Sequence, residues 1–262
     1  MRTREFLNTT EGFTEIIESE MVFIKDWFDE IAQCKEAQKK GFQIYDDDYD
    51  NISVIQDSRQ NIVSDSLKMI FAKYSAGFSM EEIKKDYLIA LNEMYIVWSE
   101  RTLESFCHDT TAPCYNTDEY WKILQLLSLG VLLNVSEKET IQIISIRDKV
   151  ADSDFMLDYI CSYFDERKLS FVQSKADNYN GLVKAIKGCT MENASSVMKD
   201  YLNRQWLKDY KRQGFLTTHN SKFNIHSGYW SFESGAIMKI LNADDSLLKG
   251  QQFYPYDMVH WQ

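Results

Sequence analysis

The sequence predicts an all-α protein, with N-terminal antiparallel helical hairpins packed on a C-terminal multi-helix domain. Apolar residues recur with helical spacing along most of the chain, and no long stretch alternates as a strand would. There are only 2 Pro and 10 Gly among 262 residues, so few breaks between helices are forced. With 44% hydrophobic and 26% charged residues, such a chain can bury a substantial core without disulfides or metals.

The first helix is expected over residues 11–40. Its early turns are rich in acids and its last turn in lysines, which suits the helix dipole, and Gly41 follows as a cap. The residues predicted to form one apolar face are Phe13, Ile16, Ile17, Ile24, Trp27, Phe28 and Ile31.

Two further helices should complete the N-terminal region. The second is predicted over residues 51–76, where Gly77 stops it. Ser79 and Glu82 form a capping box for the third, which we expect to run to about Phe106. The turn between these two helices is short, so they should pack antiparallel.

The polar segment 108–116 (HDTTAPCYN) contains one of the two prolines and is the best candidate boundary. It divides the chain into an N-terminal helical domain, residues 1–109, and a C-terminal helical domain, residues 110–262. A helix over residues 117–133 is apolar on most sides, which predicts a central position. Other helix starts and stops are predicted at Ser136 with Glu139, Asp152, Thr190, Gly188 and Gly250.

The net charge of −11 repels nucleic acids and anionic membranes and favours a basic protein partner, although acidity also serves solubility alone. The chain starts without the apolar stretch of a secretory signal. Its 5 scattered cysteines fit a reducing compartment better than a disulfide framework. We therefore expect a cytoplasmic protein that binds neither nucleic acid nor membrane directly.

No motif predicts catalysis. His108-Asp109 is the dipeptide of HD-type phosphohydrolases, but those enzymes need a further histidine upstream, and none of the 4 histidines precedes His108. The chain lacks H-E-x-x-H, C-x-x-C, glycine-rich phosphate loops and the G-x-S-x-G elbow. The sequence thus predicts no catalytic residue, no metal site and no cofactor.

The acidic run Asp46, Asp47, Asp48 and Asp50 lies between the first two predicted helices. Carboxylates this close repel one another, which favours a solvated loop. Such a loop can simply cap the next helix, or it can meet Lys and Arg on a partner.

Three charged residues fall on apolar helix faces and are expected to be buried. Glu20 and Arg59 lie in the middle of the apolar stripes of the first and second helices, so we predict that they pair with each other. Glu233 is central to the apolar face of residues 229–241. We expect it to be hydrogen-bonded, to a Tyr hydroxyl, His226 or a helix N-terminus, although a general acid or base is the alternative.

The C-terminal stretch 228–261 has the most specific pattern. It resembles the C-terminal signature of the PoNi family of bacterial immunity proteins. Arg4-Glu5 and the segment 74–87 (YSAGFSMEEIKKDY) resemble that family's N-terminal domain. Within the C-terminal stretch, the signature residues are Tyr229, Trp230, Glu233, Asp244, Asp245, Tyr254, Pro255, Tyr256 and Asp257.

The resemblance implies an all-α immunity protein that binds and blocks a PoNe-type DNase toxin delivered by type VI or other contact-dependent secretion. Its signature residues look like fold determinants. We expect the partner-binding residues elsewhere: Asp46, Asp47, Asp48 and Asp50, with the first-helix acids Glu15 and Asp29. A homodimer is left open.

Two other interpretations remain. One is an all-α enzyme with a carboxylate-rich pocket around Glu20, Glu233 or Asp257. The other is a generic helical scaffold protein.

Overall fold

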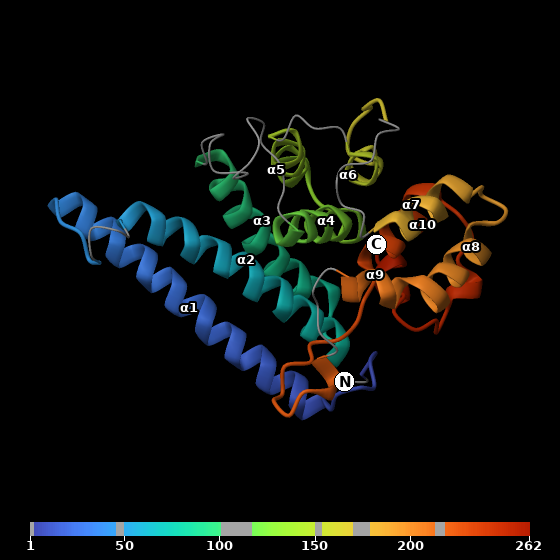
Figure 1. Cartoon of the computed structure of the whole chain (residues 1–262), viewed down its shortest axis with the longest axis horizontal. Helices are drawn as coiled ribbons and strands as arrows, with labels where there is room; N and C mark the ends of the chain where they lie inside the picture. The colour runs from blue at the N-terminus through green and yellow to red at the C-terminus, as the bar shows by residue number, and fades with distance from the viewer. Residues whose placement is uncertain (1–2, 46–49, 101–116, 150–153, 170–178, 213–217) are drawn as a thin grey trace. The chain divides into compact units, whose positions relative to one another are not determined.

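The computed structural model describes residues 3–45, 50–100, 117–149, 154–169, 179–212 and 218–262. These residues contain helices and no strand, which confirms the all-α prediction (Figure 1). The chain divides into two compact units. Unit 1 comprises Met1–Arg101 and Lys222–Gly228, and unit 2 comprises Thr102–Ser221 and Tyr229–Gln262. The domain boundary predicted at residues 109 and 110 lies outside the described residues.

Unit 1 is built on three long helices, α1 (Thr10–Lys40), α2 (Asn51–Ala76) and α3 (Met80–Glu100) (Figure 1). α1 packs along α2, and α2 packs on α3. The predicted glycine caps are confirmed, because Gly41 and Gly77 both adopt left-handed backbone conformations with φ of 76° and 89°. The Ser79–Glu82 capping box is confirmed as well.

α2 is the central helix of unit 1. Its buried residues, which include Ile62, Leu67 and Ile70, lie around most of its circumference. α1 instead buries a narrow stripe centred on Phe13, Ile17 and Ile24. The placement of Phe28 on that buried face is wrong: it lies at the edge of the stripe and is 39% exposed.

The N-terminus and the segment Lys222–Gly228 close one end of unit 1. Arg4 Nη1 donates to the carbonyl oxygens of Tyr74 and Phe78, each at 3.1 Å, and so covers the C-terminal end of α2. The His226 ring lies 3.2 Å from Glu5 Oε1, and both residues are buried. Arg4-Glu5, part of the family-like pattern, therefore stabilises the fold.

Unit 2 is an array of shorter helices. α4 (Thr117–Leu132) has a long run of buried residues from Ile123 onward, which confirms its predicted central position. It packs against α5, α6 and α10. The elements that follow α4 are α5 (Glu137–Asp148), α6 (Phe155–Cys161), α7 (Asn180–Gly188), α8 (Ala194–Tyr201), the π-helix η3 (Leu202–Trp206), α9 (Leu207–Arg212), the 3₁₀ turn η4 (Thr218–Asn220), α10 (Phe232–Leu241), the 3₁₀ turn η5 (Ser246–Leu248) and α11 (Tyr256–Val259).

Two of the helix signals predicted for unit 2 agree with the structure. The capping box of Ser136 and Glu139 is present at α5, and α7 ends at Gly188. Thr190 is not an N-cap, because α8 starts later, with Asn193 in that position. Asp152 lies outside the described residues, and Asp154 caps α6. Among the described residues, no helix is both long enough and apolar enough to cross a membrane.

Candidate functional site

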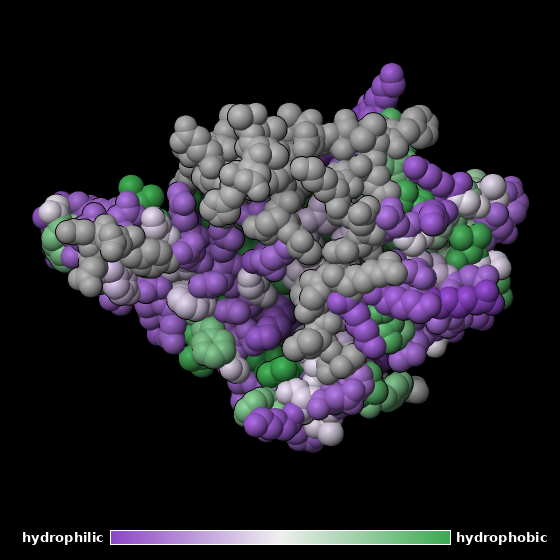
Figure 2. Space-filling model, viewed as in Figure 1, coloured by the Kyte–Doolittle hydropathy of each residue, from purple (hydrophilic) through white to green (hydrophobic). Residues whose placement is uncertain are grey.

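The outward side of α1 carries a row of exposed carboxylates. Residues near 180° from the buried stripe of a helix point to solvent, and the acids of α1 cluster there. The members of this row, which we call the acidic face of α1, are Glu11, Glu15, Glu18, Asp26 and Asp29. The face visible in Figure 2 is mostly hydrophilic along α1, with hydrophobic side chains at isolated places.

Positive charge compensates little of this row. Residues 10–30 contain 7 carboxylates and one lysine, Lys25, which lies 2.7 Å from Asp29. Glu15 also accepts a hydrogen bond from Asn224 Nδ2 at 2.9 Å. An exposed Lys–Asp pair contributes little stability, so the acidic face acts mainly through the field it projects.

The acidic run between α1 and α2 is described only in part. Asp46, Asp47 and Asp48 lie outside the described residues. Asp50 is the N-cap of α2, where Oδ1 accepts the Ser53 N–H at 2.7 Å. Hydrogen bonds from Ser53 lower the pKa of Asp50. Capping uses one oxygen of this residue and keeps its negative charge, so both proposed roles of the loop remain compatible.

Glu20 and Arg59 are buried, but each has a different partner from the one predicted. Glu20 Oε1 lies 2.6 Å from Lys68 Nζ of α2, and Arg59 Nη1 forms an ion pair with Glu93 of α3. The predicted Glu20–Arg59 pair is therefore wrong. The helical wheel of one helix indicates that a charge is buried, but the packing of the neighbouring helices decides which residue is its partner. Burial raises the pKa of Glu20, and Lys68 offsets part of that rise.

Glu233 is buried at the start of α10 and held by several donors. Its carboxylate accepts hydrogen bonds from Trp206 Nε1 and Ser231 Oγ, both at 2.9 Å, and from Gln125 Nε2 at 3.4 Å. Burial raises its pKa, although these donors and its own backbone N–H in the first helical turn act against the rise. Of the three alternatives for its partner, the helix N-terminus agrees with the position of Glu233 in the first turn of α10, whereas the His226 ring contacts Glu5 in unit 1.

A small cavity adjoins Glu233. The π-helix η3 places Trp206 against the carboxylate, and π-helical turns are frequent at functional sites. The volume open to a water centre is about 10 Å³, which suits one water molecule and not an organic substrate. Its lining residues are Trp121, Gln125, Tyr179, Tyr201, Trp206, Asp209, Tyr210, Trp230 and Glu233.

The three carboxylates named as alternatives for an enzyme pocket have different surroundings. Glu20 is ion-paired with Lys68, Glu233 is buried among hydrogen-bond donors, and Asp257 is exposed. Within the described part of the chain, no group of three His, Cys, Asp or Glu side chains could hold a metal ion.

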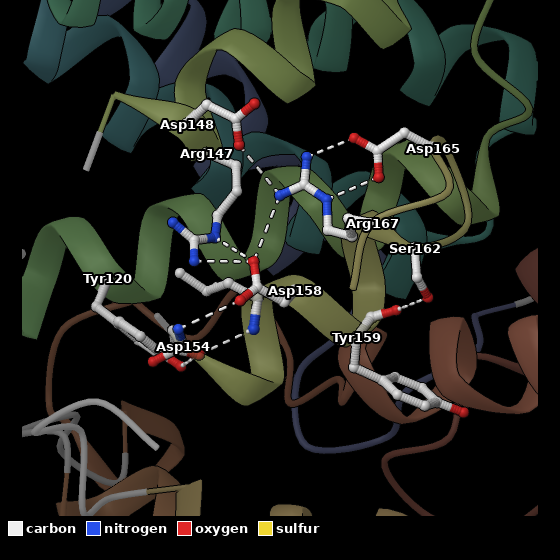
Figure 3. Close-up of polar contacts among 10 residues, drawn as sticks. Tyr120, Arg147, Asp148, Asp154, Asp158, Tyr159, Ser162, Asp165 and Arg167 are labelled. Carbon is white, nitrogen blue, oxygen red and sulfur yellow. Dashed lines mark hydrogen bonds and ion pairs between the residues drawn. The ribbon is translucent and has the colours of Figure 1, made fainter. Parts of the chain in front are cut away.

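An ion network that sequence reasoning missed connects α5, α6 and the turn after α6 (Figure 3). Asp158 Oδ1 accepts from Arg147 Nε at 2.9 Å and lies 2.8 Å from Arg147 Nη2. Arg167 reaches the same oxygen at 3.4 Å and binds both carboxylate oxygens of Asp165, at 2.7 and 2.5 Å. The hydrogen bonds to Asp165 are the main reason that the pKa of Arg167 is raised, so this guanidinium stays charged.

Asp154 extends this polar cluster toward α4. Its Oδ1 accepts from the Leu157 N–H at 2.9 Å and from the Tyr120 hydroxyl at 3.0 Å (Figure 3). The cluster is nearly closed to solvent, because Arg147, Asp154 and Asp158 are all buried. Buried carboxylates that accept from arginines and N–H groups in this way hold α5 and α6 together.

The C-terminal signature residues contact one another. The Tyr254 hydroxyl donates to Asp245 Oδ2 at 2.7 Å, and Asp244 Oδ1 accepts the Ser246 N–H at 2.9 Å. Tyr229, Trp230 and Tyr254 are buried. Gly235 lies so close to Pro255 that an added Cβ would come within 2.7 Å of the proline ring. The buried members of the signature, such as Tyr254 and Asp245, hold the end of the chain to α10, whereas Asp244 and Asp257 are exposed.

Comparison with known proteins gives family matches along nearly the whole chain. Residues 4–145 match the N-terminal model of the PoNe immunity proteins (PoNi), and residues 152–258 match the C-terminal model of the same proteins. No curated protein matches the chain. The fold is similar to the crystal structure of protein PA2201 from Pseudomonas aeruginosa, with a TM-score of 0.66 and 17% identity over 98% of this chain and 89% of that one.

Proposed function

The chain belongs to the family of PoNe immunity proteins, and on that premise we propose that it inhibits a cognate DNase toxin by covering the toxin's basic DNA-binding face. The acidic face of α1 is the proposed contact surface. The single observation that carries this proposal is the row of exposed carboxylates on α1, which has only Lys25 among it.

The charge of unit 1 supports this choice over unit 2. Unit 1 contains 20 carboxylates and 13 Lys and Arg in 108 residues, whereas unit 2 contains 20 and 16 in 154 residues. Unit 1 therefore has a net charge of −7 against −4 for the larger unit. A nuclease cleft must be positive to hold phosphates, so its field attracts the more acidic surface.

The proposed inhibition needs no chemistry. Carboxylates that occupy the cleft take the place of DNA phosphates, and long-range attraction speeds capture by ~10-fold or more at low salt. The site of action would be the cytoplasm, where the toxin meets the cell's DNA. Final affinity would come from a few desolvated anchors within the interface and not from net charge.

The test is a nuclease titration. The toxin domain encoded by the adjacent gene is mixed with plasmid DNA and increasing amounts of the full chain, and cleavage is followed on a gel. Cleavage is expected to stop near a 1:1 molar ratio. An unrelated DNase serves as a control for non-specific binding and should stay active. Continued cleavage by the cognate toxin at a tenfold excess of folded chain would refute the proposal.

A further inference from the structure

The turn that joins α1 to α2 presents large apolar side chains to solvent. Phe42 is 53% exposed, Ile44 40% and Ile52 56%, and Tyr45 is exposed beside them. Single apolar residues on a surface are normal, whereas exposed apolar side chains that gather in one place can mark an interaction site. We call Phe42, Ile44, Tyr45 and Ile52 the apolar tip. Hydrophobic atoms lie among hydrophilic ones where α1 ends and α2 begins, at the left of the view (Figure 2).

Asn51 holds the segment of residues 42–44 that follows α1. The Asn51 side chain is buried, its Nδ2 donates to the Phe42 carbonyl at 2.8 Å, and its Oδ1 accepts the Ile44 N–H at 3.0 Å. The Asn51 N–H donates to Gln43 Oε1 at 2.8 Å. Three hydrogen bonds that involve Asn51 thus set the direction in which Phe42 and Ile44 project.

A second set of contacts orients the ring of Tyr45. Its hydroxyl donates to Glu30 Oε1 at 2.6 Å, and Ser58 Oγ donates to Glu30 Oε2 at 2.7 Å. The ring is therefore held at the surface by α1 and α2 together. The apolar tip is ordered before any partner arrives, and an anchor that is already ordered loses less entropy on binding.

The charge around the apolar tip indicates the kind of partner. Residues 29–57 contain 8 carboxylates and 3 lysines, and two of these lysines lie 3.9 and 3.2 Å from Glu36. The Tyr45 hydroxyl donates to Glu30, the neighbour of Asp29 in α1, so the tip lies next to the end of the acidic face. A matching partner surface combines an apolar pocket with flanking Lys and Arg.

We infer that the apolar tip is the anchor of the toxin interface and inserts into an apolar pocket at the rim of the nuclease's basic cleft. This inference rests on the proposed function and adds the residues that supply affinity. The acidic face brings the nuclease to α1, and the tip then holds it. Phe42 and Ile44 are the side chains that determine the lifetime of the complex.

The test measures the dissociation constant for a catalytically inactive toxin domain at physiological salt. Phe42→Ser and Ile44→Ser should each weaken binding by about 30-fold, whereas Phe42→Leu should retain most of it. Leu247→Ser is the matched control, because Leu247 is a 57% exposed apolar residue of unit 2. Its affinity should stay within about twofold of wild type. Circular dichroism and thermal unfolding confirm that each variant is folded, and Ile52→Ser replaces any variant that is not.

Two results would overturn the inference while leaving the proposed function intact. One is wild-type affinity in the Phe42→Ser/Ile44→Ser double variant. The other is a chain that self-associates through the tip, seen as sedimentation that changes in these variants while toxin affinity does not. If the wild-type chain itself fails to bind or inhibit the toxin, both the proposed function and the proposed anchor are refuted.

Discussion

The acidic face of α1 and the Asp158 network of unit 2 are both built on carboxylate side chains, which are exposed in the first and mostly buried among arginines in the second. On the acidic face of α1 the carboxylates are exposed and outnumber nearby cations. In the network, Asp158 is buried and lies within 3.4 Å of both Arg147 and Arg167. A buried charge needs a partner inside the fold, whereas an exposed excess of charge is available to a partner outside it.

This difference separates stability from binding. Changes in the network should lower the free energy of unfolding and affect inhibition only through loss of folded protein. Changes on α1 should alter toxin binding and leave the fold unaffected.

The largest effect is expected for Asp158→Leu. The substitution leaves Arg147 buried without the carboxylate that accepts from its Nε and Nη2, which should cost about 3–5 kcal/mol of unfolding free energy. Urea unfolding followed by circular dichroism measures the loss. The control is Asp200→Leu, an exposed acid of the same unit, for which a change below about 0.5 kcal/mol is expected. A similar small change for Asp158→Leu would show that the network contributes little.

Unit 1 also contains a buried ion pair, formed by Arg59 and Glu93. Arg59→Met should destabilise the protein by about 3 kcal/mol, because it leaves Glu93 buried with only Asn92 Nδ2 donating to it, at 3.1 Å. The double variant Arg59→Met/Glu93→Leu should recover most of that loss, since both charges are gone. A double variant no more stable than the single one would contradict this account of the pair.

Local signals in the sequence predicted what depends on local chemistry. Gly41, Gly77 and the two capping boxes act within a few residues, so the helix ends they define agree with the structure. Phe28 was misplaced because the width of a buried stripe depends on how many helices cover it, and the pattern of α1 alone does not give that number. Thr190 resembles an N-cap, but the chain continues as a turn up to Asn193.

In the candidate site, too, the features that depend on local sequence could be predicted, whereas those that depend on tertiary contacts could not. Helical periodicity places Glu15 and Asp29 outward without any tertiary information. Apart from Ser231, the partners given for Glu20, Arg59 and Glu233 are 27 to 108 residues away along the chain, so periodicity could not identify them. Four apolar residues near an acidic run were a visible signal for the tip, but their exposure depends on hydrogen bonds made by Asn51.

Charge reversal on α1 should affect binding alone. Glu15→Lys/Asp29→Lys is expected to weaken toxin binding by ~10-fold at low salt, mainly by slowing association, and the difference should shrink as salt rises. The matched control, Glu192→Lys/Asp200→Lys, changes the net charge equally through exposed acids of unit 2. Surface plasmon resonance over a salt series measures both. Equal effects for the two double variants would mean that net charge, and not the acidic face, governs capture.

The smallest effect concerns pH and Glu233. Because burial raises the pKa of Glu233, the folded state binds this proton more tightly than the unfolded state does. The stabilisation is complete below the unfolded pKa of about 4.5 and is lost as pH rises through the folded pKa. Between the unfolded and the folded pKa, the free energy of unfolding of wild type should therefore fall relative to that of Glu233→Gln by up to about 1.4 kcal/mol per pH unit. Parallel urea curves from pH 5 to 8 check this, and an unchanged difference would contradict it.

The most direct test of the central claim is a hydrogen-exchange map of the chain with and without its toxin domain. The account predicts that protection appears at the apolar tip and at the first turn of α2, with side-chain footprinting showing new shielding along the acidic face of α1. The buried network around Asp158 should exchange equally slowly in both states. New protection confined to unit 2, with α1 and the tip unchanged, would contradict the claim that the exposed carboxylates of unit 1 meet the nuclease.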